Sequence, residues 1–220
     1  MSGQDAAIRK ILLFSCLLAG IIIAVGDFKI LSFFKSNAWV LKGDVYYLLR
    51  IGGSMWTWLL ISISIALAFP RSDSASPLRL RVERDSISLK MAAISICLSA
   101  GLGGLIAEFL KLIIRRERPI DQEVYVFRAF SERAWSTSGL GLPSSHAAVA
   151  FGGSLALITI FPTLRWPALG MAIGCGFTRI SSGAHYPTDV AAGALVGCFA
   201  NYLAGLWLRR ESWKHNRTSK

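Results

Sequence analysis

Residues 87–114 read ISLKMAAISICLSAGLGGLIAEFLKLII, an apolar stretch with only three charged side chains. The stretch exceeds the ~20 apolar residues that a helix needs to cross ~30 Å of hydrocarbon, so it predicts a membrane-spanning helix. Acidic side chains at membrane depth are usually paired. Glu108 is therefore expected to contact Lys111 or another neighbour rather than to act directly in catalysis.

Further apolar stretches lie on both sides of this one, and together they predict six spans. Lipid offers the backbone no hydrogen-bond partner, so every span must be helical. The expected spans are residues 10–26, 47–70, 87–114, 144–161, 166–181 and 188–208. Residues 28–35 mix aromatic side chains with lysines, which is typical of a short helix in the membrane interface. The expected fold is all-α, a six-transmembrane-helix bundle with a short interfacial helix between spans one and two.

The composition supports a membrane protein. The 220 residues are 53% hydrophobic and 17% charged, against about 25% charged in an ordinary soluble domain. The length suits one domain, residues 1–220. Arg9 and Lys10 precede the first apolar run, but no small-residue cleavage site follows, so we expect an uncleaved helix there. All four cysteines lie within apolar runs, which predicts small buried side chains rather than a disulfide framework.

The net charge of +11 has a distribution that predicts the topology. Basic residues gather at the N-terminus, between spans two and three, between spans four and five, and in the tail at 209–220. Six spans put these segments on one side, which the positive-inside rule makes cytoplasmic. We therefore expect an inner-membrane protein with both termini in the cytoplasm. Its basic charge would contact anionic lipid rather than nucleic acid.

The loop between spans three and four also carries cations, although it lies on the opposite, extracytoplasmic face. An anionic substrate would explain them. The arginines concerned are Arg115, Arg116, Arg118, Arg128 and Arg133. Lys111 and Arg118 are seven residues apart, so on a continuous helix they lie two turns apart on nearly one face. Pro119 is expected to end that helix.

Two of the three histidines lie at this same face. His146 follows Pro143, Ser144 and Ser145 at the start of span four, and His185 lies just before span six. His185 and Asp189 are four residues apart, which makes them neighbours on a helix. A carboxylate on one ring nitrogen fixes the tautomer and leaves the other nitrogen free as a nucleophile.

The same residues suit phosphate chemistry. Residues 143–146 open a helix, where unpaired N–H groups attract a phosphate. Lys111, Arg118 and Arg179 are candidates to surround its oxygens, and His146 then remains as the acid for the leaving group. The sequence contains no cluster of residues at metal-ligand spacing. We therefore expect a metal-independent site without a cofactor.

Three motifs in residues 111–189 resemble the signature of the type 2 phosphatidic acid phosphatase (PAP2) superfamily. The motifs are Lys111-x6-Arg118-Pro119, Pro143-Ser144-Ser145-His146, and Thr178-Arg179-x5-His185-x3-Asp189. The family includes membrane lipid phosphatases with six helices. Ser145 replaces the usual glycine of the second motif, and Thr178 replaces the usual serine of the third.

The resemblance implies a role for each matching residue. His185 would attack phosphorus and form a phosphohistidine, Asp189 would orient it, and His146 would protonate the leaving oxygen. The remaining matching residues would hold the phosphoryl group: Lys111, Arg118, Ser144, Arg179 and the backbone N–H of Ser145.

We therefore expect a membrane lipid phosphatase that acts at the outer leaflet on a lipid phosphate monoester or diphosphate. Polyprenyl diphosphate and lipid A phosphate are the favoured substrates. One alternative is a phosphotransferase that passes the phosphoryl group to another lipid or a sugar. A second is a non-catalytic lipid-binding protein. The expected partners are the substrate and the surrounding membrane lipids; the sequence identifies no protein partner.

Overall fold

A computed structural model describes residues 26–36, 43–68, 80–82, 85–87, 89–119 and 124–218. Its α-helices are α2 (Asp27–Ser36), α3 (Asp44–Ile51), α4 (Met55–Ala68), α5 (Leu89–Ile114), α6 (Ser145–Ile160), α7 (Arg165–Ser181) and α8 (Pro187–Thr218). A single 3-10 turn, η2 (Pro162–Leu164), joins α6 to α7. The first predicted span, 10–26, lies outside the described residues except for Gly26.

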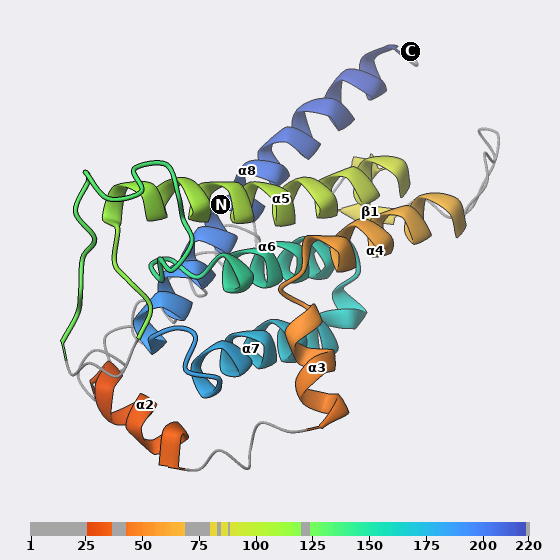
Figure 1. The fold of residues 1–220 in the computed structure, drawn as a ribbon. Helices are drawn as coiled ribbons and strands as arrows, with labels where there is room; N and C mark the ends of the chain where they lie inside the picture. The colour runs from red at the N-terminus through yellow and green to blue at the C-terminus, as the bar shows by residue number, and fades with distance from the viewer. Residues whose placement is uncertain are drawn as a thin grey trace.

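Helices α5, α6 and α8 form the centre of the bundle. Helix α6 packs against both of the others, α7 packs on α6, and α4 packs on α5 (Figure 1). Close helix contact depends on small residues. A Cβ atom on Gly103 would lie 2.7 Å from the carbonyl oxygen of Ala148, and one on Gly197 would lie 2.6 Å from the same oxygen. The apolar core between the helices includes Trp58, Ile96 and Leu157.

The chain is arranged so that four helix ends meet. The C-terminal ends of α5 and α7 lie beside the N-terminal ends of α6 and α8, at the left of the bundle in Figure 1. The long α5–α6 loop covers this end. Residues that are far apart in the sequence are thereby collected at one end of the bundle.

Two described helices are long and apolar enough to cross a membrane, Leu89–Ile114 and Pro187–Glu211. Helices α3 and α4 add a third span if they count as one, although they are bent by 73°. Helices α6 and α7, with 16 and 17 residues, are shorter. Helix length and composition thus support two or three of the six predicted spans.

The second predicted span, 47–70, is not one continuous helix. It breaks between α3 and α4, where Gly52 and Gly53 pack tightly against other helices. A Cβ atom on Gly53 would lie 2.7 Å from Cys175 Sγ and 2.8 Å from His146 Cβ. The chain passes too close to α6 and α7 for side chains at this point, and two glycines weaken a helix.

The expected all-α fold also has one small exception. Strands β1 (Leu80–Val82) and β2 (Asp85–Ile87) form an antiparallel hairpin with Leu80 opposite Ile87. The third span therefore begins at Leu89, two residues after the predicted start. The short helix predicted at 28–35 is present as α2. It buries Asp27 and Leu31 and exposes Phe33.

Candidate active site

His185 lies in the turn between α7 and α8 and is fully buried. Its Nδ1 lies 3.1 Å from the carbonyl oxygen of Gly141 and 3.5 Å from Asp189 Oδ2. Both of these oxygens only accept hydrogen bonds, so the proton of a neutral ring belongs on Nδ1. Among the described residues, Nε2 has no hydrogen-bond partner. The ring therefore presents an unprotonated Nε2.

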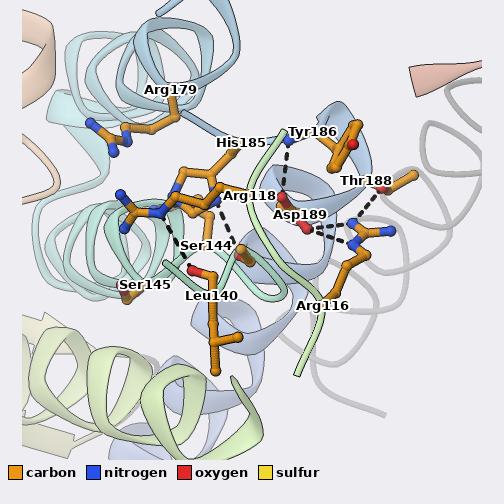
Figure 2. Close-up of polar contacts among 12 residues, drawn as sticks. Arg116, Arg118, Leu140, Ser144, Ser145, Arg179, His185, Tyr186, Thr188 and Asp189 are labelled. Carbon is orange, nitrogen blue, oxygen red and sulfur yellow. Dashed lines mark hydrogen bonds and ion pairs between the residues drawn. The ribbon is translucent and has the colours of Figure 1, made fainter. Parts of the chain in front are cut away.

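Asp189, in the first turn of α8, lies beside His185 as the spacing predicts, but its main charged partner is a different residue. Arg116 pairs with Asp189 Oδ1 through Nη2, and its Nε donates to the same oxygen at 3.1 Å (Figure 2). Asp189 Oδ2 accepts from the backbone N–H of Tyr186 at 2.9 Å. The carboxylate is thus held from two sides. The sequence pattern groups Arg116 with the other cations of the loop and does not indicate this contact.

Gly141 is a second residue that sequence reasoning missed. Its carbonyl accepts from His185, and a Cβ atom at this position would lie 2.7 Å from Asp189 Oδ2. Only glycine fits against the carboxylate here. No pattern in the sequence marks it, since His185, which donates to its carbonyl, lies 44 residues further along the chain.

Arg118 and Arg179 bring positive charge to His185. Arg179 is buried on α7, and its Nε has no hydrogen-bond partner within the described chain. Arg118 donates from Nε to the carbonyl of Leu140 at 3.4 Å. Among the described residues, neither arginine forms an ion pair with a carboxylate. Their guanidinium groups point to the same side of His185 (Figure 2), so these two arginines form a cationic pair beside the ring, without a carboxylate partner among the described residues.

Lys111 is buried at the end of α5 and has two partners. Its Nζ donates to Glu108 at 2.6 Å and to Ser145 Oγ at 3.0 Å. The expected contact between Glu108 and Lys111 is therefore confirmed. Ser145, which replaces the family's glycine, lies in α6 without a positive φ, so it fits a position that needs no glycine. Its hydroxyl adds a hydrogen bond to Lys111.

The start of α6 brings Ser144 and His146 to the same place. Ser144 caps the helix, since its Oγ accepts from the backbone N–H of Ala147, and its own N–H donates to the carbonyl of Asp189 at 2.9 Å. His146 lies within the electrostatic reach of Arg179 and His185. Thr178, the other departure from the family pattern, donates to the carbonyl of Cys175 within α7 at 2.7 Å.

Most of the arginines in the α5–α6 loop have partners within the protein, which corrects the expectation that they all serve a substrate. Arg115 is buried, and it donates to the backbone carbonyls of Arg128, Ala129, Glu132 and Ala134 at 2.5–3.2 Å. Arg128 pairs with Glu117 at 2.9 Å, and Arg116 pairs with Asp189. Arg133 is exposed. Arg118 is thus the loop arginine that points towards the His185 side chain (Figure 2).

Arg118 also reaches the site by a different route from the one predicted. Helix α5 ends at Ile114, and Arg115 takes a φ of 60°, so no continuous helix joins Lys111 to Arg118. The following residues are extended and form bridges, Arg116 with Phe127 and Glu117 with Leu140. The carbonyls that surround Arg115 are those of the loop itself, which sequence periodicity does not reveal.

Burial lowers the pKa of His185 below its ordinary value of 6.5. The contact with Asp189 acts in the opposite direction, while Arg179 and Arg118 lower the pKa further. The ring is therefore neutral at pH 7, the state that a nucleophile requires. Among the described residues, no group of three or more His, Cys, Asp or Glu side chains is placed to hold a metal ion.

These features define a class of protein: a helical membrane protein with a buried, neutral histidine beside unpaired arginines. The sequence model of the PAP2 superfamily matches residues 92–213, more than half of the chain. The chain belongs to this superfamily.

Individual relatives agree with the assignment. The lipid A 1-phosphatase of Rhizobium johnstonii is 33% identical over 107 residues, which cover 49% of this chain and 44% of that protein. The lipid A 4'-phosphatase of Bacteroides thetaiotaomicron is 35% identical over 104 residues, 43% of this chain and 44% of that protein. The chain thus matches less than half the length of these relatives.

A solved structure has the same fold. The transmembrane PAP2-type phosphatidylglycerolphosphate phosphatase of Bacillus subtilis superposes with a TM-score of 0.58 at 19% identity. The match covers 92% of this chain and 96% of that chain. Together with the apolar helices, this fold indicates a membrane protein.

Proposed function

We propose that the protein is a membrane lipid phosphatase in which His185 attacks the phosphorus of a lipid phosphate. The observation that carries the proposal is that two buried nitrogens beside one another in the site, His185 Nε2 and Arg179 Nε, belong to the buried polar atoms without a hydrogen-bond partner among the described residues. An unpaired buried charge is strongly destabilising, so a site built around one suits an anionic ligand. Arginine binds phosphate oxygens two at a time, and Arg118 lies on the same side of His185.

The reaction would proceed in two steps. His185 Nε2 attacks phosphorus, the bond from phosphorus to the lipid oxygen breaks, and His146 gives its proton to that oxygen. Water then attacks the phosphohistidine, His146 takes a proton from the water, and inorganic phosphate leaves with His185 restored. The positive charge that develops on His185 would be stabilised through Nδ1–H by the Gly141 carbonyl and by Asp189.

Binding of the phosphoryl group would fall to the residues around Nε2. Arg118 and Arg179 would hold two of its oxygens, and Lys111 would turn from Glu108 towards a third. The N-terminal end of α6, with Ser144 and the N–H of Ser145, would also bind the phosphoryl group, because a helix N-terminus favours an anion.

The substrate that we favour is a lipid A phosphate, because two relatives are named lipid A phosphatases. Polyprenyl diphosphate is the second candidate. We place the reaction at the outer leaflet of the inner membrane, within a six-span domain of residues 1–220 whose termini are both cytoplasmic. No metal ion or cofactor enters this scheme.

A phosphate-release panel tests the proposal. Purified protein in detergent would be given lipid A, undecaprenyl diphosphate and phosphatidylglycerol phosphate, each with and without excess EDTA. We expect free phosphate from lipid A at a rate that EDTA does not change. Transfer of phosphate to an added lipid or sugar without release of free phosphate would favour a phosphotransferase. Binding without turnover of any lipid would favour a lipid-binding protein, and loss of activity in EDTA with recovery on Mg²⁺ would contradict the metal-free scheme.

A further inference from the structure

A buried carboxylate on α2 lies next to the catalytic end of the bundle. Asp27 is 1% exposed, although it is 158 residues before His185 in a part of the chain that the family match does not include. Its Oδ1 accepts from the backbone N–H of Thr188 at 3.0 Å, and its Oδ2 accepts from Tyr125 Oη at 2.8 Å and from Thr188 Oγ1. Three donors on one buried carboxylate indicate a built site.

Thr188 connects this carboxylate to Arg116. Arg116 Nη2 donates to Thr188 Oγ1 at 2.7 Å. Arginine only donates, so the Thr188 hydroxyl accepts from Arg116 and must give its own proton to Asp27. The direction of hydrogen-bond donation is therefore fixed: Arg116 donates to Thr188, and Thr188 donates to Asp27.

Two aromatic rings confine the same guanidinium group. Arg116 Cζ lies 4.8 Å from the ring centroid of Tyr125 and 5.2 Å from that of Tyr186. Burial and the hydrogen bond to Asp27 raise the pKa of Tyr125 to about 12, so this hydroxyl remains a donor. The two rings and the Thr188 hydroxyl therefore hold the guanidinium group in its orientation. Its remaining contact is with Asp189 (Figure 2).

We propose that Asp27 is a positioning residue for the reaction: through Thr188 and Arg116 it holds the Asp189 carboxylate in place against His185. The inference rests on the proposed function. It assigns part of the active site to α2, outside the three motifs. The carboxylate of Asp189 is then set by α2 and the α5–α6 loop as well as by its own helix.

The test compares Asp27→Asn with wild type in phosphate release from lipid A. The amide can still accept from the Thr188 N–H, but it removes the negative charge and one of the two acceptor oxygens. We expect kcat to fall about tenfold and KM to change less than twofold, because the substrate does not contact Asp27. Asp44→Asn is the matched control: Asp44 also lies in the first turn of a helix, but it is exposed.

The pH profile separates positioning from a structural defect. His185 faces Asp189 from α8, Arg179 from α7, Arg118 from the α5–α6 loop and His146 from α6. When Arg116 is no longer anchored, Asp189 is no longer held against His185 and raises the pKa of His185 less, so the acid limb of kcat/KM is expected to move to lower pH. A loss of stability alone would leave the acid limb of the folded fraction unchanged.

Thr188 provides a second test if Asp27→Asn does not fold. Thr188→Ser keeps the hydroxyl and should keep wild-type kcat, whereas Thr188→Val keeps the shape and should lose about as much as Asp27→Asn. Wild-type kcat and acid limb in Asp27→Asn, or equal activity of the two Thr188 variants, would overturn the inference while the proposed function stands. Failure of the wild-type protein to release phosphate from any lipid would overturn the proposed function and this inference with it.

Discussion

At the scale of single residues, the site depends on the proton of one imidazole ring. Nδ1 of His185 faces two oxygens that only accept, which leaves Nε2 as the bare nitrogen. Asp189 is at the same time paired with Arg116, so the negative charge beside His185 is partly neutralised. The ring is therefore kept neutral until it acts.

The pH dependence of turnover follows from this arrangement. The folded-state pKa of His185 is lowered below 6.5, mainly by burial, so the neutral ring, the form required by the proposed mechanism, persists to a lower pH than in a free histidine. We expect kcat/KM to hold at pH 6.5 and to fall only in more acidic solution. The same sign applies to stability: the contribution of the neutral ring is present above 6.5 and is lost as the pH falls through the folded-state pKa.

Measured profiles of kcat/KM and of the melting temperature check this expectation. Asp189→Asn should move the acid limb further towards low pH, because Asp189 raises the pKa of His185. An acid limb above 6.5 in the wild-type protein would contradict the account.

Glu108 gives a second prediction at this scale. Its carboxylate holds Lys111 and competes with a substrate phosphate for it. Glu108→Gln should lower KM about two- to fivefold, the effect of removing a partly exposed ion pair worth up to ~1 kcal/mol, while kcat changes little. Glu132→Gln, on the exposed part of the α5–α6 loop, is the control. A large fall in kcat would instead assign Glu108 a direct catalytic role.

At the scale of elements, the end of α5 determines how the loop meets the site. Arg115 has a positive φ, which turns the chain. Its side chain donates hydrogen bonds to four backbone carbonyls of the loop. The same turn starts the extended segment in which the N–H of Arg118 donates to the carbonyl of Gly139 at 2.9 Å. One buried arginine therefore shapes the loop that places Arg118 beside His185.

Replacement of Arg115 by lysine tests this role. Lysine is a point charge with three donors and cannot reproduce the fork that reaches four carbonyls. Hydrogen bonds to a charged group are worth about 1.5–3 kcal/mol each, so we expect the free energy of unfolding to fall by about 3 kcal/mol. We also expect KM to rise. Arg133→Lys is the matched control, because Arg133 also has a positive φ but is exposed. Equal melting temperatures for the two variants would contradict the role.

The elements also show which parts of the fold and site can be predicted from the sequence. Contiguous hydropathy was sufficient to predict α5 and α8, and the mixture of aromatic residues and lysines predicted the short helix α2. Motif spacing predicted that His185 and Asp189 lie together. The break at Gly53, the end of α5 and the partners of Asp189 were missed. Each depends on contacts with residues that are not neighbours in the sequence, such as His146 with Gly53 and Arg116 with Asp189. Local pattern carries no information about such pairs.

At the scale of the whole molecule, the antiparallel course of the central helices explains why a single site forms. Two C-terminal and two N-terminal helix ends meet (Figure 1), and Lys111, Ser144, Arg179 and Asp189 lie at or next to these ends. The basic tail extends beyond the other end of the bundle on α8. The predicted topology puts these two ends on opposite sides of the membrane.

Cysteine labelling tests this sidedness. In a variant without its native cysteines, Ser131→Cys on the α5–α6 loop should react with an impermeant thiol reagent in intact cells, whereas Ser212→Cys on the tail should react only after permeabilisation. Release of phosphate by both variants would show that they are folded. The reverse labelling pattern would put the site in the cytoplasm.

The most direct test of the central claim is to trap the phosphorylated protein. Wild-type protein would be mixed rapidly with lipid A that carries radiolabelled phosphate, quenched in denaturant, and its label tested for acid and alkali stability. We predict a label that is acid-labile and alkali-stable, as expected for phosphohistidine, that maps to His185, and that is absent from His185→Ala. His146→Ala should slow its formation and its hydrolysis, since the acid and base of both steps is removed; general acid–base catalysis contributes about 10²–10⁴-fold. An identical label in His185→Ala would contradict the account, because the nucleophile would then be another residue.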